Sequence, residues 1–265
     1  MTTKPLCLLI HGYQGTSFEM EPLAGPLMEL GVPVRLVTLP GHDSRLEDFR
    51  RSFYPDWLAR VDEEYRCGLD EYGAVIPMGF SLGGVLALAL AERHSPMAAV
   101  GIATPASRPR FRMSSRYFWL QAALPLLRFF IKELRQPPPK PESRAIAPWR
   151  GYEAALNPPQ IRSLFKGIDQ VRRNLPAVKA PLLLIHDLGD KGVAAENALR
   201  IARSVSSGRV ELEFTRIHGE TVTSRHTITT HRETRALVAA RVGRFVADIC
   251  SIPYHQAARA GQRAL

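Results

Sequence analysis

The sequence predicts an α/β protein with a mostly parallel β-sheet flanked by helices. Three observations carry this prediction. Short apolar runs alternate with helical patterns along the chain, which is the arrangement of a parallel sheet with crossover helices. The runs are continuous, as expected for strands buried on both faces. The 265 residues are 45% hydrophobic and 23% charged, an ordinary globular composition that can bury a large core.

The first part of the chain is expected to form four strands, at residues 6–10, 32–39, 74–80 and 98–103. Helices are expected between them, at residues 16–31, 54–70 and 82–93. The first helix is predicted to open with a capping box, in which Thr16 and Glu19 bond each other's backbone N–H groups. In the second helix, Trp57, Val61 and Tyr65 are spaced to share one buried face.

The pattern stops after residue 103 and resumes with strands at 181–185 and 210–214 and helices at 194–205 and 233–247. The stretch Pro105–Ala180 holds 15 basic and 4 acidic residues, a net charge of +11, and 11 of the 21 prolines. We therefore divide the chain into a core, at residues 1–105 and 180–265, and an inserted basic, proline-rich segment at 106–179.

Several classes of protein are excluded by what the sequence lacks. No apolar run approaches the roughly 20 residues that span a bilayer, and the N-terminus has no signal-peptide pattern. Three cysteines, Cys7, Cys67 and Cys250, do not make a disulfide framework, and we expect them to be reduced. We expect a cytoplasmic protein. The histidines and acidic residues do not have metal-ligand spacing, so we predict no metal and no cofactor.

The sharpest motif is Gly79-Phe80-Ser81-Leu82-Gly83, at the junction of a predicted strand and a predicted helix. A serine on such a tight turn has strained dihedral angles, and only very small residues fit two positions to either side. Gly79 and Gly83 meet that requirement. The pattern predicts that Ser81 is a nucleophile at a sharp elbow, beside the N–H groups of a helix N-terminus.

A nucleophilic serine needs a histidine base and an acid that orients it. After an elbow of this kind, the acid and then the base follow later in the chain. Asp190 lies in the loop after the strand at 181–185, and we favour it over Asp187, which is closer to the strand end and suited to capping a turn. His218, His226 and His231 all remain candidates for the base.

The first predicted strand runs into His11-Gly12-Tyr13-Gln14-Gly15. Its glycines would let backbone N–H groups turn toward a common point above Ser81. The N–H groups of Tyr13 and Leu82 are therefore expected to form an oxyanion hole.

With these pieces in place, the chain resembles the α/β-hydrolase superfamily, and within it the small bacterial carboxylesterases and monoacylglycerol lipases. The matching segments are Leu8–Gly15, Leu39–His42, Gly79–Gly84, the Asp190 loop and Ser224–Thr229, and the resemblance spans about residues 6–105 and 180–248. It implies an α/β-hydrolase fold, a helical cap at the position of the insertion, and His226 as the base. The chain departs from the family where Val193 and Ala194 replace the proline usual after the acid, and where residues 218–223 lengthen the approach to His226.

The predicted cap carries many aromatic and aliphatic residues between Phe111 and Leu134, with basic residues such as Arg128 interspersed and Arg135 directly after them. They are expected to pack the cap, line an acyl pocket or contact a lipid surface. Its charge is expected either to draw anionic substrates or anionic lipid toward Ser81 or only to keep the cap soluble. No nucleic-acid motif accompanies the charge, and we expect no nucleic-acid partner.

The sequence therefore predicts a cofactor-independent serine hydrolase that cleaves carboxylic esters of short to medium acyl chains, monoacylglycerols among them, through Ser81, His226 and Asp190. Two alternatives stay open: an acyltransferase or thioesterase with the same residues, and a non-catalytic relative that binds a ligand.

Overall fold

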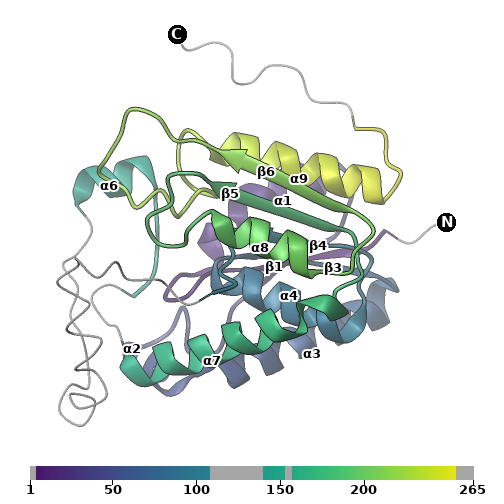
Figure 1. Cartoon of the computed structure of the whole chain (residues 1–265), viewed down its shortest axis with the longest axis horizontal. Helices are drawn as coiled ribbons and strands as arrows, with labels where there is room; N and C mark the ends of the chain where they lie inside the picture. The colour runs from purple at the N-terminus through teal and green to yellow at the C-terminus, as the bar shows by residue number, and fades with distance from the viewer. Residues whose placement is uncertain (1–3, 108–139, 153–156, 255–265) are drawn as a thin grey trace.

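A computed structural model describes residues 4–107, 140–152 and 157–254 of the chain. Within them, six parallel strands form one sheet in the order β2-β1-β3-β4-β5-β6 (Figure 1). The strands are β1 (Leu6–Ile10), β2 (Val34–Val37), β3 (Val75–Phe80), β4 (Ala99–Ile102), β5 (Leu182–Asp187) and β6 (Val210–Thr215). The mostly parallel sheet predicted from the continuous apolar runs is confirmed.

Helices precede or follow most strands, as the alternating pattern predicts. They are α1 (Glu21–Glu29), α2 (Leu46–Arg51), α3 (Tyr54–Tyr72), α4 (Leu82–His94), α6 (Pro141–Ile146), α7 (Pro158–Asn174), α8 (Glu196–Ser204) and α9 (Arg235–Ile249), with short 3₁₀ helices η1 (Ser17–Glu19) and η2 (Leu175–Ala177). Every strand and helix expected in the two blocks of the core is present, with ends that differ by a few residues.

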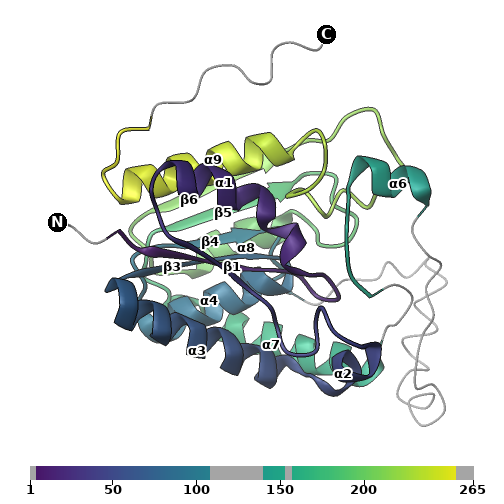
Figure 2. The same ribbon diagram turned by 180° about the vertical axis from the view of Figure 1, so that it is seen from behind.

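Two helical layers cover the sheet. Helices α1 and α9 lie on one face, and α3, α4 and α7 lie on the other, as the two opposite views show (Figures 1 and 2). Strand β1 shows the reason: Leu6, Leu8 and Ile10 enter the core on the α3–α4 side, whereas Cys7 and Leu9 enter the core on the α1–α9 side. A strand whose side chains are apolar on both faces is stable only between two layers, because each buried side chain of this size contributes about 1.5–3 kcal/mol.

Two details differ from the sequence-based expectation. The capping box at Thr16 is wrong: Thr16 makes no side-chain capping bond, and the Glu19 carboxylate instead accepts a hydrogen bond from Gly12 N. Helix α7 falls within the predicted cap range of 106–179, yet its buried Leu164, Ile168 and Val171 belong to the same core as α3 and α4. Residues 108–139 lie outside the described residues, so the cap stays a prediction.

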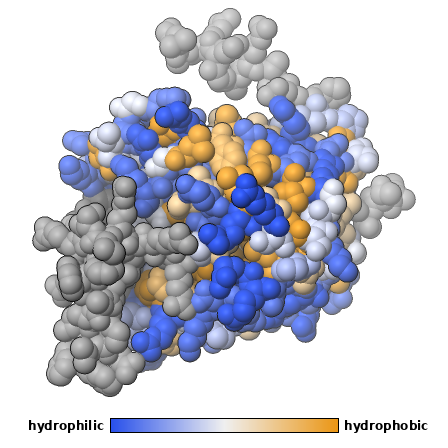
Figure 3. Space-filling view, in the orientation of Figure 1, coloured by the Kyte–Doolittle hydropathy of each residue, from blue (hydrophilic) through white to orange (hydrophobic). Residues whose placement is uncertain are grey.

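The surface seen in Figure 3 is mixed. Hydrophobic side chains gather near β6 and α9, where Leu212 and Leu237 are exposed, and hydrophilic side chains surround them. In the described part of the chain, no helix combines the length and the apolar character that a membrane crossing requires. Cys7, Cys67 and Cys250 are free thiols in the structure.

Candidate active site

The candidate site lies where the carboxyl ends of neighbouring parallel strands meet. Ser81 directly follows β3, Asp190 follows β5, and His226 lies in the loop between β6 and α9. The loop that carries Tyr13 follows β1, which pairs with β3. In Figure 1 this edge of the sheet is on the left, on the same side as α6 and opposite the N-terminus. Such an edge is the usual place for ligands in an open α/β sheet.

Ser81 sits on a strained turn between β3 and α4. Its φ of 52° and ψ of −113° are unfavourable for a residue with a side chain. A Cβ on Gly79 would lie 1.9 Å from the Gly83 carbonyl carbon, and a Cβ on Gly83 would lie 2.0 Å from the Ile10 carbonyl oxygen. The two glycines are therefore required by contact with backbone, as the motif predicts, and the turn leaves Ser81 partly exposed.

The structure brings Ser81, His226 and Asp190 into one hydrogen-bonded chain. His226 Nδ1 lies 2.7 Å from Asp190 Oδ2, and His226 Nε2 lies 2.9 Å from Ser81 Oγ. A carboxylate only accepts hydrogen bonds, so Nδ1 carries a proton that it donates to Asp190. In the neutral ring Nε2 is then unprotonated and accepts the hydrogen bond from the Ser81 hydroxyl.

Asp190 is held as a carboxylate, and its side chain is fully buried. Burial by itself raises the pKa of this carboxyl. The neighbouring His226 and the hydrogen bonds from His186, His226 and Val193 outweigh burial, and the pKa falls to about 2. Its second oxygen, Oδ1, accepts from Gly192 N at 2.7 Å and from Val193 N at 2.9 Å. All of these donors favour the charged form, which in turn stabilises a proton on His226.

A second histidine contacts the same carboxylate. His186, near the end of β5, is buried, and its Nε2 lies 2.8 Å from the Val193 carbonyl oxygen and 3.3 Å from Asp190 Oδ2. Since a carbonyl oxygen only accepts, Nε2 carries the proton and faces both oxygens. Sequence analysis did not single out His186. Its position near the carboxyl end of a central strand, four residues before Asp190, is the signal that would have found it.

The competing acid and bases have other partners. Asp187 Oδ1 accepts from Gly189 N at 2.8 Å, and its Oδ2 accepts from Thr215 Oγ1 at 2.9 Å and from Ile217 N at 3.0 Å, so it joins the ends of β5 and β6. His218 is exposed. His231 is buried, and its Nε2 lies 3.6 Å from Glu220 Oε1. None of these three has a hydrogen bond to Ser81 among the described residues.

Lys191, next to Asp190, links the loop after β5, called here the acid loop, to the loop that carries His226, called here the base loop. Its backbone N–H donates to the Ser224 carbonyl at 2.8 Å, and its Nζ donates to the Thr221 and Thr223 carbonyls at 3.2 Å each. Thr221 and Thr223 belong to the stretch that lengthens the approach to His226. The longer loop is therefore anchored from the acid side. Gly192 lets the ring come close, because a Cβ there would lie 3.3 Å from His226 Cγ.

The loop after β1 is fixed by its own hydrogen bonds. His11 Nε2 accepts from Leu39 N at 3.2 Å, so its Nδ1 carries the proton and donates to the Gly12 carbonyl at 2.9 Å. Burial lowers the pKa of His11 to about 4, which keeps it neutral. Gly15 N also donates to the Gly12 carbonyl, at 3.3 Å. Because a trans peptide is planar, the Tyr13 N–H points away from that carbonyl.

Among the described residues, neither of the two expected oxyanion donors has a backbone hydrogen-bond partner. Among the described residues, the Tyr13 N–H has no backbone hydrogen-bond partner. Leu82 is the first residue of α4, and the first N–H groups of a helix have no partner within the helix. The Tyr13 hydroxyl is engaged elsewhere, 3.2 Å from Gln160 Oε1. An oxyanion hole at this place remains the expectation from the sequence.

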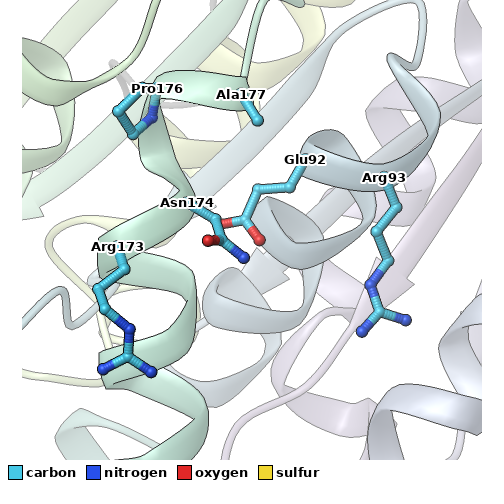
Figure 4. A pocket seen from close by; sticks show the side chains of 6 residues that line it. All are labelled: Glu92, Arg93, Arg173, Asn174, Pro176 and Ala177. Carbon is cyan, nitrogen blue, oxygen red and sulfur yellow. The ribbon is translucent and has the colours of Figure 1, made fainter.

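The described part of the chain contains no group of three or more histidine, cysteine or acidic residues that could hold a metal ion. A cavity of about 350 Å³ lies between the C-terminal ends of α4 and α7. In Figure 4, Glu92 and Asn174 lie beside each other there, while Arg93 and Arg173 point away from them. Since α4 runs back from Ser81, the helix rise places this cavity about 17 Å from the candidate site.

Comparison with known proteins identifies the family to which this fold belongs. A sequence profile described as the Alpha/beta hydrolase family matches residues 7–241. The chain belongs to the α/β hydrolase family.

Among curated relatives, it is similar to a thermostable monoacylglycerol lipase from Bacillus sp. strain H-257, with 40% identity over 87 residues. That match covers 33% of this chain and 35% of the lipase, so it spans about a third of that relative. It is also similar to a carboxylesterase from Bacillus subtilis strain 168, with 23% identity over 218 residues that cover 82% of this chain and 84% of the esterase.

Solved structures agree on the fold. A structure reported for the metagenome-derived lipolytic enzymes LipS and LipT matches with a TM-score of 0.77 and 23% identity, over 94% of this chain and 95% of that one. The monoacylglycerol lipase from Paleococcus ferrophilus matches with a TM-score of 0.70 and 15% identity, over 93% and 96%. The resemblance to esterases and monoacylglycerol lipases predicted from the motifs is confirmed.

Proposed function

We propose that this protein is a serine hydrolase that cleaves carboxylic esters with short to medium acyl chains, monoacylglycerols among them. The observation that carries the proposal is the hydrogen-bonded chain from Asp190 through His226 to Ser81, with its Ser81 end on a strained strand-to-helix turn. The partial match to a monoacylglycerol lipase and the longer match to a carboxylesterase support the substrate class.

In the proposed reaction, Ser81 Oγ attacks the ester carbonyl carbon while His226 Nε2 takes the hydroxyl proton. The carbonyl π electrons move to oxygen, and the N–H groups of Tyr13 and Leu82 hold the resulting oxyanion. Each such donor contributes about 3–4 kcal/mol of transition-state stabilisation. Asp190 stabilises the imidazolium, because it is a buried carboxylate already bonded to Nδ1.

The intermediate collapses when the bond to the leaving alkoxide breaks, and His226 returns its proton to that oxygen. A water molecule then attacks the acyl-enzyme, with His226 again as the base, and releases the acid and free Ser81. Protonation of His226 removes the acceptor on which both steps depend. Activity should therefore fall toward acid pH.

The test is a panel of p-nitrophenyl esters from acetate to palmitate together with 1-monoacylglycerols, assayed for free acid with the wild-type protein and with Ser81→Ala and His226→Ala. We expect kcat/KM to peak at short or medium chains and each substitution to lower kcat by about 10⁴-fold or more. Release of acid at the wild-type rate by Ser81→Ala would refute the proposed nucleophile. Including an alcohol such as glycerol and an acyl thioester in the panel separates hydrolysis of esters from acyl transfer and thioester cleavage.

A further inference from the structure

The loop after β1, which carries Tyr13, packs against a carboxyl group that the proposed reaction does not use. Glu19 ends the short helix η1 and is only 1% exposed. Among the described residues, no cation forms an ion pair with it. A buried carboxyl without a cation is destabilising unless its hydrogen bonds are well made, so its position requires a local explanation.

The loop is built around this carboxyl. Glu19 Oε2 accepts the hydrogen bond of Gly12 N at 2.7 Å. A Cβ on Gly15 would lie 2.4 Å from the Glu19 carboxyl, and a Cβ on Gly12 would lie 3.1 Å from Oε2. The glycines of this loop therefore make room for Glu19 as well as for the turn. With its N–H bound to Glu19 and its carbonyl bound to His11 and Gly15, Gly12 is fixed on both sides.

The segment 146–152, which begins at the last residue of α6, contacts the Glu19 carboxyl. The Trp149 side chain forms a hydrogen bond with the Glu19 carboxyl. Three residues later, Tyr152 N donates to the Gln14 carbonyl at 2.9 Å. The same segment contacts the base loop, because the Pro148 carbonyl accepts from Thr230 Oγ1 at 2.6 Å. The 146–152 segment thus joins two loops: it contacts the Tyr13 loop through Glu19 and Gln14, and the His226 loop through Thr230.

We propose that Glu19 is a positioning residue for the oxyanion hole: its carboxyl group holds the N–H of Gly12, in the peptide just before the one that carries the Tyr13 N–H, and so limits the rotation of Gly12 that would turn the Tyr13 N–H away from the substrate. The proposal rests on the proposed function of the Ser81 site. A donor that is displaced by even 1 Å loses much of its effect, so a rigid support behind the loop has a direct consequence for the rate.

The protonation state of Glu19 gives this support a pH dependence. Burial raises the pKa of Glu19 to about 8 and outweighs the hydrogen bonds from Gly12 N and Trp149, which lower it. At neutral pH the carboxyl is therefore mostly uncharged. Above pH 8 it becomes an anion that is hydrogen-bonded to the peptide next to the one that faces the developing oxyanion, and this negative charge disfavours the transition state.

The other charged or titratable groups on the packed segments leave this assignment in place. His11 on the loop is neutral, and burial raises the pKa of Tyr13 beyond the range of the assay. On the 146–152 segment, the Arg150 guanidinium lies 4.4 Å from the Phe18 ring centre and is exposed. Glu21, at the start of α1, is also exposed and serves as a matched control.

The experiment measures kcat and KM for p-nitrophenyl butyrate from pH 6 to 9.5 with the wild-type protein and the Glu19→Ala, Glu19→Gln and Glu21→Gln variants, with thermal unfolding alongside. We expect Glu19→Ala to lower kcat about 10- to 100-fold with KM within about twofold. Glu19→Gln, the neutral isostere of the protonated acid, should restore most of kcat at pH 7. The wild type and Glu21→Gln should lose kcat above pH 8, whereas Glu19→Gln should not.

The wild-type rate is scored first, because its absence refutes the proposed function and not the role of Glu19. With an active wild type, two results overturn the role of Glu19: wild-type kcat in Glu19→Ala, or an alkaline loss in Glu19→Gln as large as in the wild type. If Glu19→Ala does not fold, the comparison of Glu19→Gln with the wild type above pH 8 decides the question alone.

Discussion

Exchanging each of the two aspartates after β5 for asparagine should separate catalysis from stability. In Asp190→Asn, we expect the amide oxygen to take the Oδ1 position. There it keeps the hydrogen bonds from Gly192 N and Val193 N, which are short and come from backbone groups that cannot turn away. The amide NH₂ then faces His226 Nδ1, which must become the acceptor. The ring proton moves to Nε2, and His226 can no longer take the proton of Ser81.

The expected cost is large for the rate and small for the fold. A wrong histidine tautomer lowers kcat by about 10⁴-fold in enzymes that use this arrangement. In Asp187→Asn, by contrast, the new NH₂ group faces Thr215 Oγ1 and Ile217 N, or else Gly189 N, and cannot accept from them. The loss of hydrogen bonds to a buried carboxylate should lower the free energy of unfolding by about 2–3 kcal/mol, with kcat within about threefold of the wild type.

The assay combines p-nitrophenyl butyrate hydrolysis at pH 8 with urea unfolding of the same preparations. A drop of 2–3 kcal/mol corresponds to roughly 4–12 °C in Tm for a domain of this size, which is easily measured. The reasoning is refuted if Asp187→Asn loses more kcat than Asp190→Asn, or if Asp190→Asn keeps more than about a hundredth of the wild-type rate.

Three further substitutions test other parts of the account. Gly79→Ala should abolish activity and destabilise the fold, because its Cβ would lie 1.9 Å from backbone; Gly208→Ala, whose Cβ would meet nothing within 4 Å and whose φ is not positive, should instead raise stability by about 0.4–1 kcal/mol in urea unfolding. Burial raises the pKa of Glu92 to about 7, so the wild-type protein should lose stability as pH rises from 4.5 to 7, whereas Glu92→Gln, which has no proton to lose, should not. We expect a difference of about 1 kcal/mol after solvent screening, measured by urea unfolding at pH 4.5 and 7.5. Lys191→Met should lower kcat about tenfold at unchanged KM, because the base loop loses two hydrogen bonds; equal kcat would show that the loop holds its shape without them.

Much of the fold could be read from the sequence because burial on both faces leaves a simple signal. A run such as Leu6–Ile10 is typical of a strand buried on both faces, and Gly79 and Gly83 around Ser81 restrict the turn so tightly that its geometry follows from sterics. Ser81, His226 and Asp190, which the motifs and the family resemblance singled out, lie within hydrogen-bonding distance of one another.

The features that could not be predicted depend on contacts between distant segments. Glu19 fits the spacing of a capping box, but the carboxyl instead satisfies Gly12 N, an outcome that tertiary packing decides. Helix α7 begins with two prolines inside a basic, proline-rich stretch, and only its contacts with α3 and α4 show that it packs against the core. The role of His186 beside Asp190 depends on the path of the loop after β5, which no local pattern specifies.

Covalent labelling by a fluorophosphonate shows directly whether Ser81 is an activated nucleophile, because such a reagent reacts with an activated serine and leaves ordinary serines unmodified. The labelled protein is digested and the adduct is located by mass spectrometry, with Ser81→Ala and His226→Ala treated in parallel. The account predicts one adduct per chain, on Ser81, absent from Ser81→Ala and formed far more slowly in His226→Ala. An unlabelled wild-type protein, or an adduct on another serine that persists in Ser81→Ala, would contradict it.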